Sequence, residues 1–131
     1  MAHILIVDDE PDTRDVLGRV LTKHGYTVDY AANGWEALLE IDRRGFDLIL
    51  LDIMMPGLDG AKFLEILRGY AARSTTPVVI VTALDRPEAL ARIGRNPAQG
   101  IVEKKGAGFY DELLKRIEVV IGPPRGAGSP N

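Results

Sequence analysis

The stretch "ILIVDDEP" (residues 4–11) predicts a buried strand that leads directly into a helix. Its first four residues are apolar and three of them are β-branched, which is typical of a strand covered on both faces. Two aspartates, Asp8 and Asp9, follow at once, and Pro11 suits the first turn of a helix. Adjacent carboxylates at the end of a buried strand repel each other, so this pair needs a positive partner.

Similar short apolar runs recur along the chain, with amphipathic helical patterns between them. The runs are "HILIV" (3–7), "TVDYA" (27–31), "DLILL" (47–51), "PVVIV" (77–81) and "GIVEK" (100–104). The third and fourth are apolar throughout and suit central strands, whereas the second is more polar and suits a sheet edge. Five strands that alternate with five helices predict a single α/β domain, with a doubly wound parallel sheet between two helical layers.

Length and composition limit the classes of function. The chain has 131 residues, which suits one domain, and its net charge of -3 offers no clustered basic face for nucleic acid. It has no cysteine, which excludes disulfide bonds and thiolate metal sites, and no apolar run of about 18 residues that would cross a membrane. We expect a cytoplasmic domain over residues 1–121 and a disordered tail, rich in glycine and proline, over 122–131.

Polar residues follow four of the predicted strands at their carboxyl ends, where open α/β sheets form their sites. They are Asp8, Asp9, Asp52, Thr82 and Lys104. Two carboxylates about 4 Å apart repel by about 4 kcal/mol at an effective dielectric of about 20, which is large for a domain stable by about 5–15 kcal/mol. Lys104 supplies one compensating charge, and a pocket with only oxygen ligands favours Mg²⁺. A carboxylate beside such a metal can attack phosphorus, while a lysine and a hydroxyl hold the other phosphoryl oxygens.

These motifs, taken in order, resemble the receiver domain of bacterial two-component response regulators. The resemblance covers residues 3–121. "ILIVDDEPDTRDVL" resembles the acidic first motif of the family, "DLILLDIMMPGLDG" the phosphoacceptor motif and "PVVIVTA" the strand that ends in the switch threonine. The resemblance implies a flavodoxin-like sheet with strand order 2-1-3-4-5.

The resemblance also implies a role for each pocket residue. Asp52 would accept a phosphoryl group from the phosphohistidine of a sensor histidine kinase or a histidine phosphotransfer protein. Lys104 would pair with a phosphoryl oxygen, and Thr82 would turn its hydroxyl toward the phosphoryl group. Mg²⁺ would be bound by Asp9, Asp52 and the backbone carbonyl of Met54, with Asp8 acting through a bound water.

As a member of this family the chain would be a phosphoacceptor signalling domain rather than an enzyme that acts on a separate substrate. It would change conformation on phosphorylation and bind a downstream output protein or domain, without direct contact to nucleic acid or membrane. The sequence leaves open the cognate kinase, the output partner and a homodimer through the face of the fourth and fifth helices.

Two positions differ from the family pattern. Lys105 occupies the place of a proline that usually follows the lysine in a cis peptide, and a non-proline cis bond costs about 2.5–4 kcal/mol. The sequence therefore leaves open whether the Lys104–Lys105 bond is cis or trans, and which of the two lysines reaches the phosphoryl group; the spacing favours Lys104. Ile101 replaces the usual aromatic switch residue, so a threonine–aromatic exchange cannot operate in its usual form.

Two other classes of function use this fold or a related sheet. A phosphorylation-independent scaffold would keep the fold but lose pocket residues, and all five are present in this chain. A Mg²⁺-dependent hydrolase of the haloacid-dehalogenase type would carry the motif DxDx[TV] after the first strand. The sequence Asp8-Asp9-Glu10-Pro11 does not match that motif.

Overall fold

The computed structural model describes residues 2–70, 73 and 75–123, and this part of the chain forms the predicted α/β fold. Five parallel strands pair in the order β2-β1-β3-β4-β5, which confirms the predicted flavodoxin-like topology. The strands are β1 (His3–Val7), β2 (Thr27–Ala31), β3 (Leu48–Leu51), β4 (Val78–Thr82) and β5 (Gly100–Glu103). The helices are α1 (Pro11–Lys23), α2 (Gly34–Arg43), α3 (Gly60–Gly69), α4 (Arg86–Ile93) and α5 (Phe109–Ile121).

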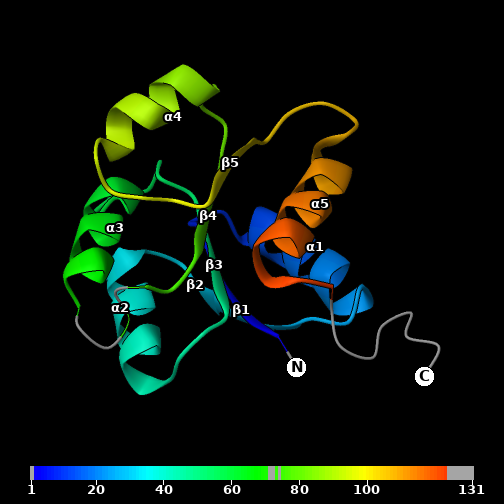
Figure 1. Cartoon of the computed structure of the whole chain (residues 1–131), viewed down its shortest axis with the longest axis horizontal. Coiled ribbons are helices and arrows are strands. Elements are labelled where there is room, and N and C mark those ends of the chain that lie inside the picture. Colours follow the sequence, from blue (N-terminus) through cyan, green and yellow to red (C-terminus); the bar gives the residue numbers. More distant parts are fainter. Residues whose placement is uncertain (1, 71–72, 74, 124–131) are drawn as a thin grey trace.

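The helices form two layers, one on each face of the sheet. Figure 1 shows α1 and α5 together on one face and α2, α3 and α4 on the other. Each face of the sheet packs against its helices in a separate hydrophobic core. Alternate residues of each central strand contribute to the two cores, because successive side chains of a strand point to opposite faces. Leu50 packs with the α1–α5 core, whereas its neighbours Ile49 and Leu51 pack with the α2–α4 core. This arrangement explains why the central strands are apolar throughout.

Side-chain caps fix where three of the helices begin. Asn33, Asp59 and Asp85 precede α2, α3 and α4, and each side chain accepts a hydrogen bond from a backbone N–H in the first turn. Asn96-Pro97 in the sequence would break a helix at about this point. The structure ends α4 earlier, at Ile93, where Gly94 adopts a positive φ of 61°.

The loop between α4 and β5 is held by a side chain of α3. Arg68 donates to the carbonyl oxygen of Pro97 from both Nε (3.1 Å) and Nη2 (2.8 Å), and its Nη1 donates to the carbonyl oxygen of Thr76 at 2.7 Å. Gln99 adds its side-chain oxygen, which accepts the N–H of Val78 at 2.7 Å. Burial lowers the pKa of Arg68. The C-terminal side of α4 is thus fixed to α3 and to the start of β4.

Two further predictions concern the C-terminal tail and the absence of a membrane-spanning helix. α5 ends at Ile121, and Gly122 and Pro123 lie beyond it outside any helix. The rest of the predicted tail, 124–131, lies outside the described residues. Among the described helices, none is both long enough and apolar enough to cross a membrane.

Gly60 lies where α3 passes against the loop that follows β3. A Cβ at this position would lie 2.4 Å from Ile53 Cα and 2.6 Å from the carbonyl oxygen of Asp52, both backbone atoms that cannot move alone. We expect Gly60→Ala to lower the free energy of unfolding by about 1–3 kcal/mol, as overpacking does elsewhere. Urea denaturation of the purified domain measures this change.

Gly69, at the other end of the same helix, is the matched control. It is exposed, and a Cβ there would meet nothing within 4 Å. Gly69→Ala should leave stability unchanged or raise it by up to about 1 kcal/mol, because alanine favours helix. Equal losses in the two variants would show that close packing at Gly60 is not the cause.

Candidate functional site

Two buried aspartates follow neighbouring strands of the sheet. Asp8 is 1 % exposed at the end of β1, and Asp52 is 6 % exposed at the end of β3. The strand hydrogen bonding continues onto both residues: Asp8 N–H donates to the carbonyl oxygen of Ala31 (3.1 Å), and Asp52 N–H donates to that of Val7 (3.0 Å). Because the strands are parallel and adjacent, both carboxylates emerge at the same sheet edge.

Asp9 joins these two residues to form what we term the acidic cluster, Asp8, Asp9 and Asp52. One carboxylate oxygen from each lies within 4.8 Å of the others. Asp9 is the more exposed member. Hard divalent cations bind oxygen ligands of this kind, so the donor set suits Mg²⁺ or Ca²⁺ better than zinc or copper.

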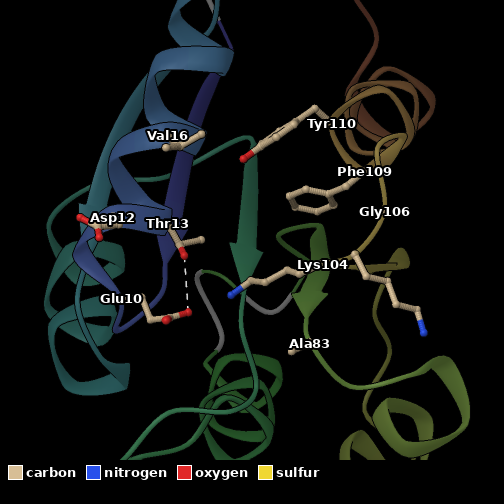
Figure 2. Close-up of a pocket in the computed structure, with 10 residues that line it drawn as sticks. Glu10, Asp12, Thr13, Val16, Ala83, Lys104, Gly106, Phe109 and Tyr110 are labelled. Atoms are coloured by element: carbon tan, nitrogen blue, oxygen red, sulfur yellow. Dashed lines mark hydrogen bonds between the residues drawn. The ribbon is translucent and has the colours of Figure 1, made fainter.

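Lys104 lies at the end of β5 and reaches into the acidic cluster. Its Nζ is 2.5 Å from Asp8 Oδ2 and 2.9 Å from Asp52 Oδ2, and its side chain is 11 % exposed. In Figure 2 this side chain extends inward from the strand end. Burial lowers the pKa of Lys104, but its hydrogen bonds and attraction to the two carboxylates outweigh burial, and the pKa is raised overall. The lysine is therefore a cation at neutral pH and offsets part of the acidic charge.

Lys105 lies outside the acidic cluster. It is exposed, and its Nζ pairs with Glu103 Oε1 at 2.8 Å, an interaction that raises the pKa of Lys105 and lowers that of Glu103. The Lys104–Lys105 peptide is trans, since the described chain contains no cis peptide bond. The structure thus puts Lys104 beside the carboxylates, as the spacing favours, and directs Lys105 elsewhere.

Backbone groups orient the remaining site residues. Met54 N–H donates to Asp52 Oδ1 at 2.9 Å, which fixes the rotation of that carboxylate. Thr82 is fully buried at the end of β4, and its Oγ1 accepts the Leu84 N–H in a long bond of 3.4 Å. Its carbonyl oxygen accepts the Lys104 N–H at 2.8 Å. The strand ends therefore bring a hydroxyl, an ammonium and three carboxylates to one edge of the sheet.

Comparison with known proteins connects this geometry to a family. The family model described as the response regulator receiver domain matches residues 4–118. The chain belongs to the response regulator receiver domain family. As a receiver domain it is a signalling domain of two-component systems, which confirms the predicted fold class and the predicted receiver-domain signalling role.

The curated relatives of this receiver domain are longer proteins. The sensory transduction protein RegX3 of Mycobacterium tuberculosis is 44% identical over 85 residues, which are 65% of this chain and 36% of RegX3. The transcriptional regulatory protein ResD of Bacillus subtilis is 42% identical over 80 residues, 61% of this chain and 32% of ResD. The chain thus spans about a third of the length of the curated relatives it matches.

Solved receiver domains superpose over nearly the whole chain. The chemotaxis protein CheY4 of Vibrio cholerae is 32% identical with a TM-score of 0.83, and the match covers 92% of this chain and 98% of that one. The response regulator TrrA of Thermotoga maritima, solved in complex with Mg²⁺ and BeF, is 32% identical with a TM-score of 0.77, covering 92% and 99%.

The receiver domain also carries a groove of about 560 Å³ beside Lys104. Figure 2 shows that α1 lines one side and the start of α5 the other. Acidic Glu10 and Asp12 lie on the α1 side, whereas Val16, Phe109 and Tyr110 supply an apolar surface. The groove is thus a largely apolar surface with charged residues at its rim, beside Lys104.

Two features of this receiver domain escape sequence reasoning. Ile101, at the usual aromatic position, is 8 % exposed and packs in the same core as Ala89 and Ile93 of α4. Arg14 of α1 donates from Nη1 to the carbonyl oxygen of Asp8 at 2.7 Å. The only sequence signal for the second contact is that Arg14 lies one helical turn beyond Glu10, which places it near the start of α1.

Proposed function

We propose that this receiver domain accepts a phosphoryl group on Asp52 and passes the signal to a protein partner by a change of conformation. The observation that carries the proposal is the pairing of Lys104 with Asp8 and Asp52, the two buried members of the acidic cluster. Burial of these charged side chains costs free energy. Binding of a phosphoryl group and its metal would account for their presence. The gathering of Asp8, Asp9, Asp52, Thr82 and Lys104 at one sheet edge supports phosphorylation over a scaffold that works without it.

The transfer forms one bond and breaks another. A carboxylate oxygen of Asp52 attacks phosphorus while the phosphorus–nitrogen bond of the phosphohistidine breaks, and the electron pair returns to the imidazole. The product is an acyl phosphate on Asp52. Lys104 then exchanges a carboxylate for a phosphoryl oxygen, and Thr82 donates its hydroxyl hydrogen to another. Because Thr82 Oγ1 accepts only a long bond from Leu84 N–H, this rotation gives up little.

Mg²⁺ is the proposed metal of the acidic cluster. We assign Asp9, Asp52 and the backbone carbonyl of Met54 as direct ligands and Asp8 as a ligand through water. When bound, the ion neutralises the carboxylates and the developing charge on the transferred phosphoryl oxygens. The convergence of the three carboxylates within 4.8 Å supports this assignment.

The proposed partners follow from the family and from the groove. We propose a sensor histidine kinase or a histidine phosphotransfer protein as the donor, and the groove between α1 and α5 is a suitable docking surface beside Lys104. An output protein or domain would read the change, and the α4–α5 face is a candidate for a homodimer. The receiver domain would comprise residues 1–121, and a cytoplasmic location stays a prediction.

Intact-mass spectrometry with a small phosphodonor tests the proposal. After incubation with Mg²⁺ and acetyl phosphate, we expect the purified chain to gain a single phosphoryl group. The same incubation with excess chelator should give none, because the uncompensated carboxylates repel the anionic donor. Addition that proceeds equally with and without chelator would contradict the proposed role of Mg²⁺, and no addition in either would contradict phosphoacceptor function.

A further inference from the structure

A side chain of α1 binds the backbone of the turn that carries two members of the acidic cluster. Arg14 is the fourth residue of α1, and its Nη1 donates to the carbonyl oxygen of Asp8 at 2.7 Å. A charged donor at this distance makes a strong hydrogen bond. The acceptor is not a carboxylate oxygen but the carbonyl of the Asp8–Asp9 peptide. Arg14 therefore acts on the orientation of that peptide.

The two aspartates of this turn are held in different ways. Asp8 has a backbone partner in Ala31, and its carboxylate accepts both the Glu10 N–H (2.9 Å) and Lys104 Nζ. The carboxylate of Asp9, in contrast, has no hydrogen-bond or ion-pair partner among the described residues. With no such partner, the backbone of Asp9 is the main restraint on where its carboxylate can point. The backbone of Asp9 begins at the Asp8–Asp9 peptide, and the carbonyl of this peptide accepts the hydrogen bond from Arg14.

We infer that Arg14 is a positioning residue for the cation site. By holding the carbonyl of Asp8, it keeps the Asp8–Asp9 peptide in the orientation that turns the Asp9 carboxylate toward Asp52. This inference rests on the proposed function, since it assumes that the acidic cluster binds Mg²⁺. Residues that orient metal ligands from outside the ligand set commonly change metal affinity by about 10- to 100-fold.

Three roles for Arg14 predict three different results. If Arg14 acted only through its charge, its removal would strengthen Mg²⁺ binding, because a positive charge near the cluster repels the cation. If it only stabilised the fold, its removal would lower the unfolding temperature and leave Mg²⁺ affinity unchanged. A positioning role alone predicts weaker Mg²⁺ binding despite the loss of a positive charge. The sign of the affinity change therefore separates the three.

The experiment compares Arg14→Met, Arg14→Lys and the control Arg19→Met. Methionine keeps much of the length and apolar stem of Arg14 but removes its donors, whereas lysine keeps the charge and a donor at the chain end. Arg19 lies on the same helix but is exposed and pairs with Asp15. Mg²⁺ titration of each unphosphorylated protein, followed by amide NMR shifts, gives the dissociation constant, and thermal unfolding in chelator gives the metal-free stability.

We expect Arg14→Met to weaken Mg²⁺ binding about tenfold, Arg14→Lys to recover part of the loss, and Arg19→Met to match the wild type. Equal or tighter Mg²⁺ binding in Arg14→Met would overturn the positioning role while leaving the proposed function standing. Absence of Mg²⁺ binding in the wild type would overturn both. A lower unfolding temperature in chelator without a change in affinity would assign Arg14 to the fold alone.

Discussion

Asp52→Asn is expected to abolish phosphoryl addition from acetyl phosphate. The amide has nearly the shape of the carboxylate, and its oxygen can still accept the Met54 N–H that orients Asp52 at 2.9 Å. It is nevertheless uncharged and a poor nucleophile, so no acyl phosphate forms. Intact-mass spectrometry in the presence of Mg²⁺ should show the mass of the unmodified variant only, under conditions in which the wild type gains one phosphoryl group.

Asp15→Asn is the matched control for this experiment. Asp15 lies on the exposed side of α1, where it pairs with Arg19, away from the acidic cluster. The control should gain a phosphoryl group as the wild type does, since it removes the same charge without touching the site. Continued addition to Asp52→Asn would mean that another residue is the acceptor, and the proposed roles of Lys104 and Thr82 would then need to be reassigned.

Lys104→Met is expected to lower the stability of the Mg²⁺-free protein by about 3 kcal/mol or more. Lys104 is the cation that pairs with both Asp8 and Asp52, and these carboxylates are buried. Removal of one partner of a buried ion pair typically costs about 3–5 kcal/mol, because the other charge stays buried without compensation. Added Mg²⁺ should raise the stability of the variant by about 2.7 kcal/mol at a concentration 100 times its dissociation constant. The loss relative to the wild type should also shrink, because the variant without the Lys104 charge binds the cation more tightly.

Urea denaturation in chelator and in excess Mg²⁺ measures both effects, with Lys105→Met as the control. Lys105 is exposed and pairs with Glu103, so its replacement should change stability by no more than about 0.5 kcal/mol in either condition. A loss of stability that is similar in the two variants, or one that Mg²⁺ does not reduce, would contradict the view that Lys104 balances the acidic cluster.

The sequence predicts the gathering of the acidic cluster because parallel strands impose it. Asp8 and Asp52 each follow an apolar strand directly, and strand pairing then brings their side chains to one edge without further information. The strand order was likewise predicted from the family motifs and is confirmed. Strand ends are a reliable guide, since a whole row of backbone hydrogen bonds fixes their alignment.

Other features depend on the angle at which elements pack, which sequence periodicity does not encode. The contact of Arg14 with the Asp8 carbonyl requires α1 to return over the end of β1 at one particular tilt. The sequence offers two places where α4 could end, at Gly94 and before Asn96-Pro97. The helix ends at the first of them, where Gly94 adopts a positive φ.

The Arg68 contacts have a mechanical consequence for α4. One end of this helix continues into a loop that Arg68 fastens to α3 and to the start of β4, whereas at the other end an exposed bond from Arg86 N–H to Glu103 (3.1 Å) joins it to β5. A rod fastened more firmly at one end moves chiefly by swinging about that end. We therefore expect a rearrangement at the strand edge to move the end of α4 nearest Thr82 more than the end whose loop Arg68 holds.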